Sequence, residues 1–360
     1  MSIKNISIIG LGLIGGSIAK ALRKADADYI ISAYDVSDSP KLALDDGTID
    51  AVLSSIDQSL DSDLIFISSP VDVSFEIFKE LAPKLKPNSV LTDVCSVKST
   101  FKEKWDQIES NGFYFGGHPM TGKEDGGYTN SDPLLFENAL YIISDKDENN
   151  PIFHEFTNVI KSFGSNILHI PAKQHDVIAA SVSHLPQLVS VALVNAASLK
   201  TDEYNFLDLA AGGFRDMTRI ASSDFNIWKS IISGNKDQII TAMEKFSYDL
   251  NTLKKWIIDN KELEISEYFE SARKNRDEIP KNTKGFLSPL HDLFIFIEDK
   301  PGAVSKISTA LYEKGINIKD IELLKIREGS GGTFRVSFES RDELLEASEI
   351  LGQKGFSTEH

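Results

Sequence analysis

The stretch Gly10-Leu11-Gly12-Leu13-Ile14-Gly15 follows a short apolar run at residues 6–9 and precedes a helical pattern at residues 17–24. A strand, a glycine-rich turn and a helix in this order form the first unit of a dinucleotide-binding fold. Gly10 permits the tight turn, Gly12 lets the backbone approach a pyrophosphate, and Gly15 lets the helix pack closely on the strand. The helix N-terminus then offers backbone N–H donors to the phosphates.

Asp35 lies twenty residues after Gly15, at the end of a second strand candidate. A carboxylate at this position accepts hydrogen bonds from ribose hydroxyls and repels a 2′-phosphate. The next three residues contain no cation that could hold such a phosphate, so the sequence favours NAD over NADP. The alternative interpretation is a glycine turn beside a surface aspartate. We count Leu13, Ile14 and Ser69 with the glycines and Asp35 as cofactor-binding candidates.

Short β-branched runs alternate with helical patterns over residues 1–168. The strand candidates cover residues 6–9, 29–34, 64–68, 90–93, 113–116 and 139–143. Several of these runs are apolar throughout, as expected for strands that helices cover on both faces. The sequence therefore predicts an α/β fold that begins with an NAD-binding domain, a Rossmann-like, doubly wound parallel sheet.

The sequence pattern changes after residue 168. Helical patterns cover residues 172–199, 216–221, 225–233, 236–260 and 261–276, and no convincing strand lies between residues 171 and 285. The apolar stretch 177–199 is expected in a core or in a subunit interface, and Pro186 is expected to kink it. We predict a central all-helical domain over residues 169–285.

A polar, proline-containing linker is predicted near residues 280–289. After it, the sequence predicts strands at residues 293–298, 317–327 and 333–338, helices at 302–314 and 341–354, and a short final strand. A turn at residues 328–332 joins the second and third strands. This order is that of a ferredoxin-like βαββαβ domain over residues 290–360.

The composition limits the kinds of function. The formal net charge is −16, from 54 acidic and 38 basic residues, which disfavours binding to nucleic acid. The single cysteine, Cys95, allows no intramolecular disulfide, and without a cluster of cysteines and histidines no metal is indicated. No apolar run approaches the roughly 20 residues that cross a bilayer, and no signal-peptide pattern is present. We therefore expect a cytoplasmic protein with no membrane partner.

Two segments that follow predicted strands carry candidate chemical groups. His118 lies on a predicted loop among glycines, and its imidazole can accept a hydroxyl proton near neutral pH. Ser96 could hydrogen-bond a substrate or a catalytic base, or it could cap a helix. Active groups of doubly wound sheets gather at the carboxyl ends of strands. We therefore treat His118 and Ser96 as the catalytic candidates.

A third candidate region is divided between two helical segments. The first, residues 181–187, contains His184 beside the expected kink, which could shape a pocket. The second, residues 212–221, contains a glycine pair and two arginines, and a guanidinium binds a carboxylate through two hydrogen bonds. An interhelical salt bridge is the alternative for these arginines. The other histidines have no motif context and are interpreted as surface or packing residues: His154, His169, His175, His291 and His360.

Five segments together resemble those of prephenate dehydrogenases of the tyrosine pathway, in the same order. They are residues 10–17, 92–98, 117–122, 183–186 and 212–221 with Trp228. Residues 299–321 resemble part of an ACT module. The resemblance implies NAD-dependent oxidative decarboxylation of prephenate to 4-hydroxyphenylpyruvate, with His118 accepting the ring-hydroxyl proton. It also implies a homodimer formed through the helical domain, and a C-terminal ACT domain that binds tyrosine as a feedback effector or serves assembly only.

The resemblance assigns roles to individual residues. Ser96 would hydrogen-bond His118 and the substrate hydroxyl, and Arg219 would clamp a substrate carboxylate. Ser183 and the backbone of Gly212 would line the pocket for the substrate side chain. The remaining substrate-binding candidates are His184, Gln187, Asp216 and Trp228, of which Asp216 and Trp228 would support or gate the pocket.

Two departures from the family pattern concern specificity and packing. Gln187 stands where the family often has a histidine, and it keeps hydrogen bonding but loses a possible positive charge. Arogenate or mixed cyclohexadienyl specificity is therefore an alternative to prephenate. Cys95 stands where glycine is common and is interpreted as a packed small residue.

Two further alternatives come from other classes of protein. One is a reductase of the same superfamily that acts on an imine or a β-hydroxy acid, and the His118 and Arg219 segments argue against it. The other is a non-catalytic ligand-sensing protein, against which His118, Ser96 and Arg219 also argue.

Overall fold

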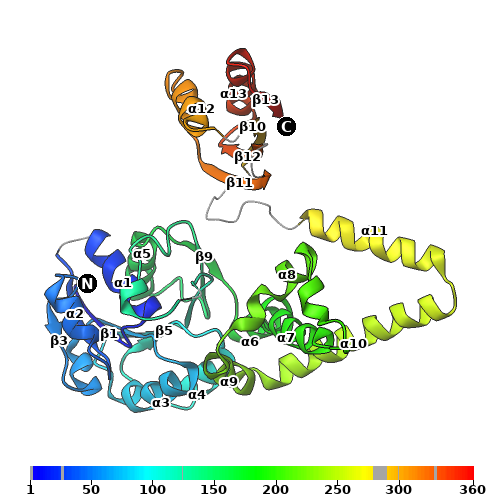
Figure 1. Cartoon of the computed structure of the whole chain (residues 1–360). Helices are drawn as coiled ribbons and strands as arrows, with labels where there is room; N and C mark the ends of the chain where they lie inside the picture. The colour runs from blue at the N-terminus through cyan, green and yellow to red at the C-terminus, as the bar shows by residue number, and fades with distance from the viewer. Residues whose placement is uncertain (1–2, 26–27, 124, 279–289, 299, 328–330) are drawn as a thin grey trace. The chain divides into compact units, whose positions relative to one another are not determined.

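Strand β1 (Asn5–Ile9) lies in the middle of a six-stranded parallel sheet (Figure 1). The strand order is β3-β2-β1-β4-β5-β6, so the chain runs outward from β1 on one side and then returns to build the other. The remaining strands are β2 (Ile30–Tyr34), β3 (Ala51–Val52), β4 (Leu64–Ile67), β5 (Val90–Asp93) and β6 (Phe113–Tyr114). The direction of strand addition reverses between β1 and β4, where ligands of such sheets bind at the carboxyl ends.

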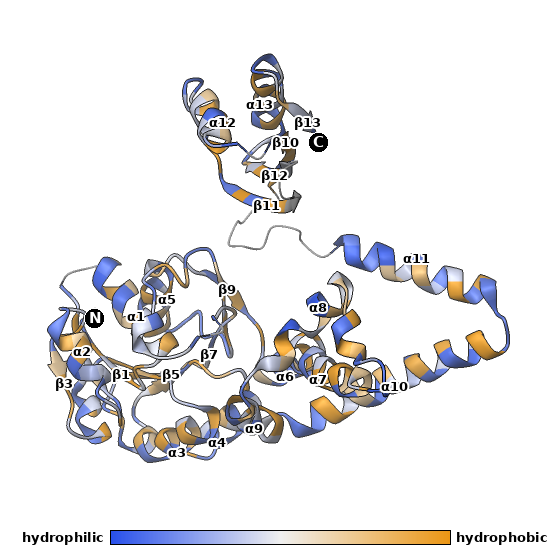
Figure 2. Ribbon diagram, in the orientation of Figure 1, coloured by the Kyte–Doolittle hydropathy of each residue, from blue (hydrophilic) through white to orange (hydrophobic). Residues whose placement is uncertain are grey.

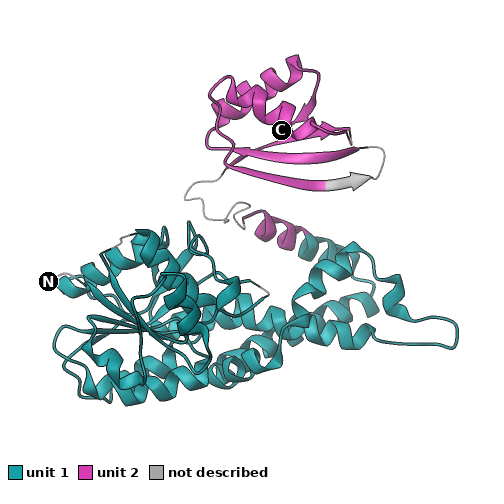
Figure 3. Ribbon diagram, turned by 60° about the vertical axis from the view of Figure 1, so that its left-hand side comes forward, with its two compact units in different colours: residues 1–269 teal, residues 270–360 magenta. Residues whose placement is uncertain are grey.

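The computed structural model describes residues 3–25, 28–123, 125–278, 290–298, 300–327 and 331–360. These residues form two compact units, residues 1–269 and 270–360, which are teal and magenta in Figure 3. The predicted linker at residues 280–289 lies outside the described residues, as does most of the predicted turn at residues 328–332.

Helices cover both faces of the parallel sheet, as the apolar strands predict. One buried cluster contains side chains of α1 (Leu13–Ala25) and α5 (Pro151–Ser162), and the other contains side chains of α3 (Val71–Leu81) and α4 (Ser99–Trp105). Strand β4 contributes alternate residues to the two clusters, because successive side chains of a strand point to opposite faces. The strands are correspondingly orange in the hydropathy view of Figure 2. The shorter elements are α2 (Ser39–Asp45), η1 (Ile56–Asp61), η2 (Ala82–Lys84) and η3 (Tyr128–Asn130).

A second, three-stranded sheet differs from the expectation. It contains β7 (Gly117–Pro119), β8 (Leu140–Ile143) and β9 (Asn166–His169), with β7 antiparallel to β8. The strand expected at residues 139–143 is present as β8, but its assignment to the parallel sheet is wrong. The expectation that His118 lies on a loop is also wrong, because His118 pairs with Ile142 in this sheet. Strands β3, β7 and β9 were not expected, although strands of similar length, such as β4 and β5, were predicted from their buried apolar runs.

The rest of the larger unit is helical, as predicted. Helix α6 (Ala172–Ala179) continues through a π-helical turn, η4 (Ala180–His184), into α7 (Leu185–Ala197). The π-helical turn therefore lies directly before Pro186, where a kink was expected. The other elements are η5 (Phe206–Leu209), α8 (Gly212–Thr218), η6 (Arg219–Ser222), α9 (Phe225–Gly234), α10 (Lys236–Ile258) and α11 (Glu262–Glu278), of which α11 continues into the smaller unit from residue 270. In the described part of residues 171–278, the β pairing consists of one isolated bridge between Lys200 and Asn205.

The continuous helix Ala172–Ala197 is long and apolar. Its mean hydropathy reaches 1.8 over an 18-residue window, and 28% of that window is buried. By length and composition alone this helix could cross a membrane, so the expectation that no run approaches that length is wrong on this criterion. Val182, for example, is 64% exposed. An apolar helix with this much exposure in one chain is typical of a subunit interface as well as of a membrane span.

The smaller unit contains the predicted βαββαβ order. Its strands are β10 (His291–Ile297), β11 (Asp320–Arg327), β12 (Gly331–Phe338) and β13 (Ser357–Glu359), and its helices are α12 (Ala303–Tyr312) and α13 (Arg341–Gln353). The antiparallel sheet has the order β11-β12-β10-β13. Its core joins side chains of β10 and β12 to Leu311 of α12 and Leu344 of α13. Both helices therefore pack on one face of the sheet, which confirms the ferredoxin-like prediction.

Candidate active site

The glycine loop turns sharply between β1 and α1. Gly10 has φ of +91°, a conformation that side-chain-bearing residues rarely adopt. A Cβ atom on Gly15 would overlap the carbonyl oxygen of Gly10, whereas a Cβ atom on Gly12 would meet nothing within 4 Å. The backbone at Gly12 therefore borders open space beside the N-terminus of α1, which carries Leu13 and Ile14 in its first turn. This arrangement has room for a phosphate group at backbone N–H donors.

Asp35 lies directly beside this loop. Its Oδ2 accepts a hydrogen bond of 2.6 Å from the backbone N–H of Leu11, and its Oδ1 accepts from the N–H and hydroxyl of Ser37. A carboxylate has further lone pairs, so Asp35 can still accept bonds from hydroxyl groups. On the opposite side of the loop, the Oγ of Ser69 lies 2.7 Å from the position of a Cβ on Gly10. The loop, Asp35 and Ser69 thus lie together at the carboxyl ends of β1, β2 and β4.

Three side chains, His118, His175 and Asp176, form a hydrogen-bonded series. The Nδ1 of His118 lies 2.8 Å from the Nε2 of His175, and the Nδ1 of His175 lies 2.8 Å from Oδ1 of Asp176. His118 comes from β7 and the other two residues come from α6. His118 is half-buried, whereas His175 is only 1% exposed. Of the two expected roles of His175, a surface residue is wrong and a packed interior residue is correct, but His175 also contacts the catalytic candidate directly.

The carboxylate of Asp176 is held at the start of α4. Its Oδ1 accepts a hydrogen bond from the backbone N–H of Lys98, and its Oδ2 accepts one from the N–H of Ser99, both at 2.8 Å. Asn235 donates to the main-chain oxygen of Asp176 from the start of α10. Burial alone would raise the pKa of Asp176, but hydrogen bonds from His175, Ser99 and Lys98 together lower it. The carboxylate is thus stabilised in its ionised form.

Burial is the largest cause that lowers the pKa of His118 well below its ordinary value, and His175, Lys98 and His184 lower it further. Lys98 is fully buried and pairs with the buried carboxylate of Asp93. His118 is therefore neutral near pH 7, with one ring nitrogen available as an acceptor. A neutral imidazole is the form that a general base requires.

His184, Gln187 and Trp228 lie around the π-helical turn. His184 is buried, and its ring contacts Trp228 edge to face with centroids 6.0 Å apart. Burial lowers the pKa of His184 to about 4. Its Nε2 has no hydrogen-bond partner in the part of the chain that the structure describes. Gln187 is buried and donates a hydrogen bond of 2.8 Å to the main-chain oxygen of Ile220, which joins α7 to η6.

Other candidates are not brought into contact with His118. Ser96 is half-buried and forms no hydrogen bond with another described residue, so the bond to His118 implied by the resemblance is absent here. Ser183 is half-buried on the π-helical turn. Gly212, Asp216 and Arg219 are exposed on α8 and η6. The 3-10 helix η6 packs on α7 and on α8, so these residues lie near one another.

The residues that sequence reasoning missed are His175 and Asp176. Their signal was a histidine followed by an acidic residue four positions after Pro171, where the sheet domain gives way to helices. Nothing in that dipeptide indicates which residue it meets, because its partners Lys98 and His118 are 57 to 78 positions away.

The comparisons with known proteins agree with this geometry. Family models match the nucleotide-binding domain of prephenate dehydrogenase over residues 18–169, its dimerization domain over residues 171–271, and the ACT domain over residues 291–354. The prephenate dehydrogenase of Bacillus subtilis is 30% identical, with 96% of this chain and 95% of the relative covered. That of Lactococcus lactis is 33% identical, with 97% of each chain covered.

A solved structure gives the same result. The prephenate dehydrogenase of A. aeolicus, in complex with hydroxyphenyl propionate and NAD+, has a TM-score of 0.69 and 33% identity. The match covers 78% of this chain and 99% of that chain. With both catalytic domains and the ACT domain matched in order, the chain belongs to the prephenate dehydrogenase family.

Proposed function

We propose that the chain catalyses the oxidative decarboxylation of prephenate to 4-hydroxyphenylpyruvate with NAD as the cofactor. The observation that carries the proposal is a neutral, half-buried His118 whose Nδ1 is bonded to His175 and whose Nε2 has no described partner. Family membership and the NAD complex of the A. aeolicus relative support the same assignment.

The residues at the carboxyl ends of β1 and β2 fit the cofactor. Gly10 and Gly15 shape the loop, Gly12 leaves open space for a pyrophosphate, and Asp35 accepts bonds from ribose hydroxyls. When bound, NAD supplies the hydride acceptor for the ring carbon that bears the hydroxyl group. Asp35 also repels a 2′-phosphate, which favours NAD over NADP.

His118 moves the proton in this reaction. Its Nε2 accepts the proton of the ring hydroxyl as the oxygen develops carbonyl character. The bond to the ring carboxylate then breaks, carbon dioxide leaves, and the electron pair of that bond makes the ring aromatic. The resulting phenolate oxygen takes a proton back, so His118 returns to its neutral form. General-base assistance of this kind contributes about 10²–10⁴-fold in rate.

The helical elements supply the substrate pocket in this proposal. Arg219 clamps a substrate carboxylate, and Ser183 and the Gly212 backbone line the side-chain pocket. Asp216 and Trp228 support or gate it, and Ser96 bonds the substrate hydroxyl. The negative net charge of −16 makes a local cation necessary for a substrate with two carboxylates.

Arogenate is the second candidate substrate, and Gln187 is the observation that favours it. The Gln187 amide is neutral and donates to the Ile220 main-chain oxygen, so this position provides no cation for a pyruvyl carboxylate. Parallel assays with NAD and either substrate test the choice. We expect kcat/KM to be higher with prephenate, and a higher value with arogenate would reassign the substrate.

We also propose a homodimer formed by the helical domain, within a division into domains at residues 1–168, 169–285 and 290–360. The exposed apolar side chains of the helix Ala172–Ala197 and the match to a dimerization domain support this assembly. A cytoplasmic location is consistent with an interface rather than a membrane span for this helix. Analytical ultracentrifugation should give a dimer mass, and a monomer at micromolar concentration would contradict the proposal.

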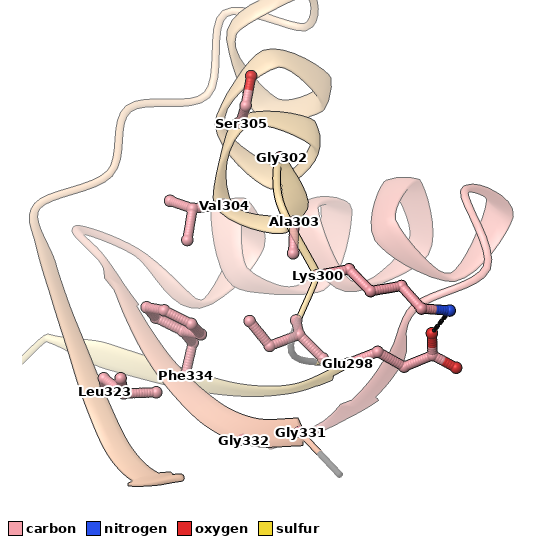
Figure 4. A pocket seen from close by; sticks show the side chains of 11 residues that line it. Glu298, Lys300, Gly302, Ala303, Val304, Ser305, Leu323, Gly331, Gly332 and Phe334 are labelled. Carbon is pink, nitrogen blue, oxygen red and sulfur yellow. Dashed lines mark ion pairs between the residues drawn. The ribbon is translucent and has the colours of Figure 1, made fainter. Parts of the chain in front are cut away.

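The ACT domain is proposed to bind tyrosine as a feedback effector. A pocket of about 370 Å³ lies between the end of β10, the start of α12 and β12 (Figure 4). Val304, Leu323 and Phe334 give it an apolar lining that suits an aromatic ring. Glu298 and Lys300, which pair with each other, also line it. The carboxylate of Glu298 suits the ammonium group of an amino acid, and the ammonium of Lys300 suits its carboxylate. The alternative, an ACT domain used only for assembly, predicts no response to tyrosine.

A further inference from the structure

The hydrogen bonds from His118 through His175 to Asp176 determine which ring nitrogen of each histidine carries a hydrogen. It extends the proposed function, because it rests on His118 being the base. His175 is almost completely buried, so its two ring nitrogens form hydrogen bonds with His118 and Asp176 rather than with bulk water. The hydrogen of each N–H must therefore be arranged consistently along the chain.

The arrangement is determined from the Asp176 end. Both oxygens of its carboxylate accept backbone N–H bonds, from Lys98 and from Ser99. An ionised carboxylate is an acceptor only, so the Nδ1 of His175 must carry a hydrogen and donate it to Asp176. In neutral His175 the other nitrogen, Nε2, then has no hydrogen and can only accept.

The tautomer of His118 follows from that of His175. Its Nδ1 faces the Nε2 of His175 at 2.8 Å, so Nδ1 of His118 must be the donor. The Nε2 of neutral His118 then carries no hydrogen and is free to accept one. If the carboxylate of Asp176 were missing, His175 could adopt its other tautomer, donate to His118, and leave the hydrogen on the wrong nitrogen.

We propose that His175 and Asp176 are positioning residues that hold His118 in the tautomer with an unprotonated Nε2 and stabilise its protonated form. When Nε2 takes a proton, the hydrogen on Nδ1 can pass to Nε2 of His175. The positive charge then lies beside the carboxylate of Asp176. No atom is gained or lost, and the reverse transfer restores the chain when the proton leaves Nε2.

The charges around His118 support this role. The described groups that face it are His175 from α6, His184 from the π-helical turn, and Lys98 from the segment before α4. The Lys98 charge is matched by the buried carboxylate of Asp93 from β5. The carboxylate of Asp176 is therefore the counter-charge for a proton that arrives at His118.

The first test reads the tautomer directly in the full chain without substrate. We expect ¹⁵N NMR of histidine-labelled protein to show His118 protonated at Nδ1 and bare at Nε2. Both His175→Gln and Asp176→Asn should give a mixture of tautomers. A wild-type His118 protonated at Nε2 would overturn the proposal, whether or not the enzyme uses prephenate.

The second test uses the pH dependence of kcat/KM. Removing the negative charge in Asp176→Asn makes His118 harder to protonate, so the acidic limb of the profile should move to lower pH. We expect kcat to fall at least about tenfold, as in other enzymes whose base loses its orienting carboxylate. The KM for NAD should not rise in parallel.

Asn235→Ala is the matched control. It removes the buried hydrogen bond from Asn235 to the main-chain oxygen of Asp176 and the longer contact of 3.3 Å to Nδ1 of His184, and it leaves the carboxylate of Asp176 in place. Its pH profile should keep the wild-type acidic limb. The proposal is wrong if Asp176→Asn and His175→Gln lose activity only in proportion to their loss of stability and keep the wild-type acidic limb. That outcome, the one expected of Asn235→Ala, would mean that their role is structural. An inactive wild type with the expected tautomer would instead refute the proposed reaction alone.

Discussion

At the scale of a single residue, the proposed proton transfer depends on where His118 is held and on its protonation state. It stands on β7, which pairs in the second sheet, while its Nδ1 partner stands on α6. Because burial and neighbouring groups lower its pKa, it is neutral in the range where the enzyme must act. The imidazole thus combines a defined orientation with an available acceptor nitrogen.

The variant His118→Asn tests this role. An amide cannot take the hydroxyl proton, so kcat with prephenate should fall by about 10²–10⁴-fold. The affinity for NAD, measured by fluorescence titration, should stay at the wild-type value because the described hydrogen bond of His118 goes to His175 and not to the glycine loop or Asp35. An unchanged kcat would remove His118 from the mechanism.

His184 predicts a pH dependence of stability. Its pKa is lowered from 6.5 to about 4 in the folded chain, so the unfolded chain binds a proton first as the pH falls. The free energy of unfolding should therefore decrease between about pH 6.5 and pH 4, by up to about 3 kcal/mol from this group. His118 acts in the same direction.

Urea unfolding at several pH values measures this effect. His184→Gln should show a smaller loss of stability across the same range, because glutamine does not titrate. The exposed His154 provides the control, and His154→Gln should keep the wild-type dependence. An equal slope for wild type and His184→Gln would contradict the assignment.

Individual residues differed in how well the sequence could predict them. His118 and Asp35 were found from local sequence, because His118 stands among glycines after a strand and Asp35 lies at the end of a strand twenty residues after Gly15. His175 has no local motif. Its role depends on contacts with β7 and with the start of α4, which are distant in the sequence. Ser96 was expected to bond His118, but in this structure His175 occupies the Nδ1 side of the ring.

At the scale of elements, the glycine loop offers a matched pair of substitutions. In Gly15→Ala the new methyl group overlaps the carbonyl oxygen of Gly10, so the loop or α1 must shift. Overpacking of this kind costs about 1–3 kcal/mol, so both the melting temperature and NAD binding should decrease. In Gly12→Ala the methyl group enters open space, so stability should stay near the wild-type value while NAD binds more weakly.

Thermal unfolding and NAD titration of the two variants separate these effects. A Gly12→Ala variant that binds NAD as tightly as the wild type would show that the pyrophosphate does not approach this point of the backbone. A Gly15→Ala variant of unchanged stability would contradict the close packing of α1 on β1.

Burial pattern and periodicity explain which elements of the fold were predictable. The core strands β1, β2, β4 and β5 are buried apolar runs, and the long helices carry clear periodicity. Length alone does not decide this, because β4 and β5 are as short as β9, but β7 reads Gly-His-Pro and β9 is only partly buried, so neither is a buried apolar run. Pro186 correctly predicted an irregular helix, but the sequence around it does not distinguish a kink from a π-helical turn.

At the scale of the whole chain, the pocket in the ACT domain predicts regulation. In Ala303→Leu the larger side chain fills part of the pocket beside Val304 and Phe334. Tyrosine should inhibit the wild-type enzyme, and the half-inhibitory concentration should rise in this variant. Glu346→Leu, which adds a leucine at an exposed position of α13 outside the pocket, should keep the wild-type value. The same response to tyrosine in Ala303→Leu would place the effector elsewhere, and no response in the wild type would favour an assembly role.

The central claim for the whole molecule is a coupled oxidation and decarboxylation of prephenate. The most direct measurement incubates the purified chain with prephenate and NAD and quantifies NADH, carbon dioxide and 4-hydroxyphenylpyruvate together. We predict that the three products form in equal amounts, because loss of the hydride and loss of the carboxylate complete one aromatisation. The absence of NADH with prephenate, or NADH formed without carbon dioxide, would contradict the account.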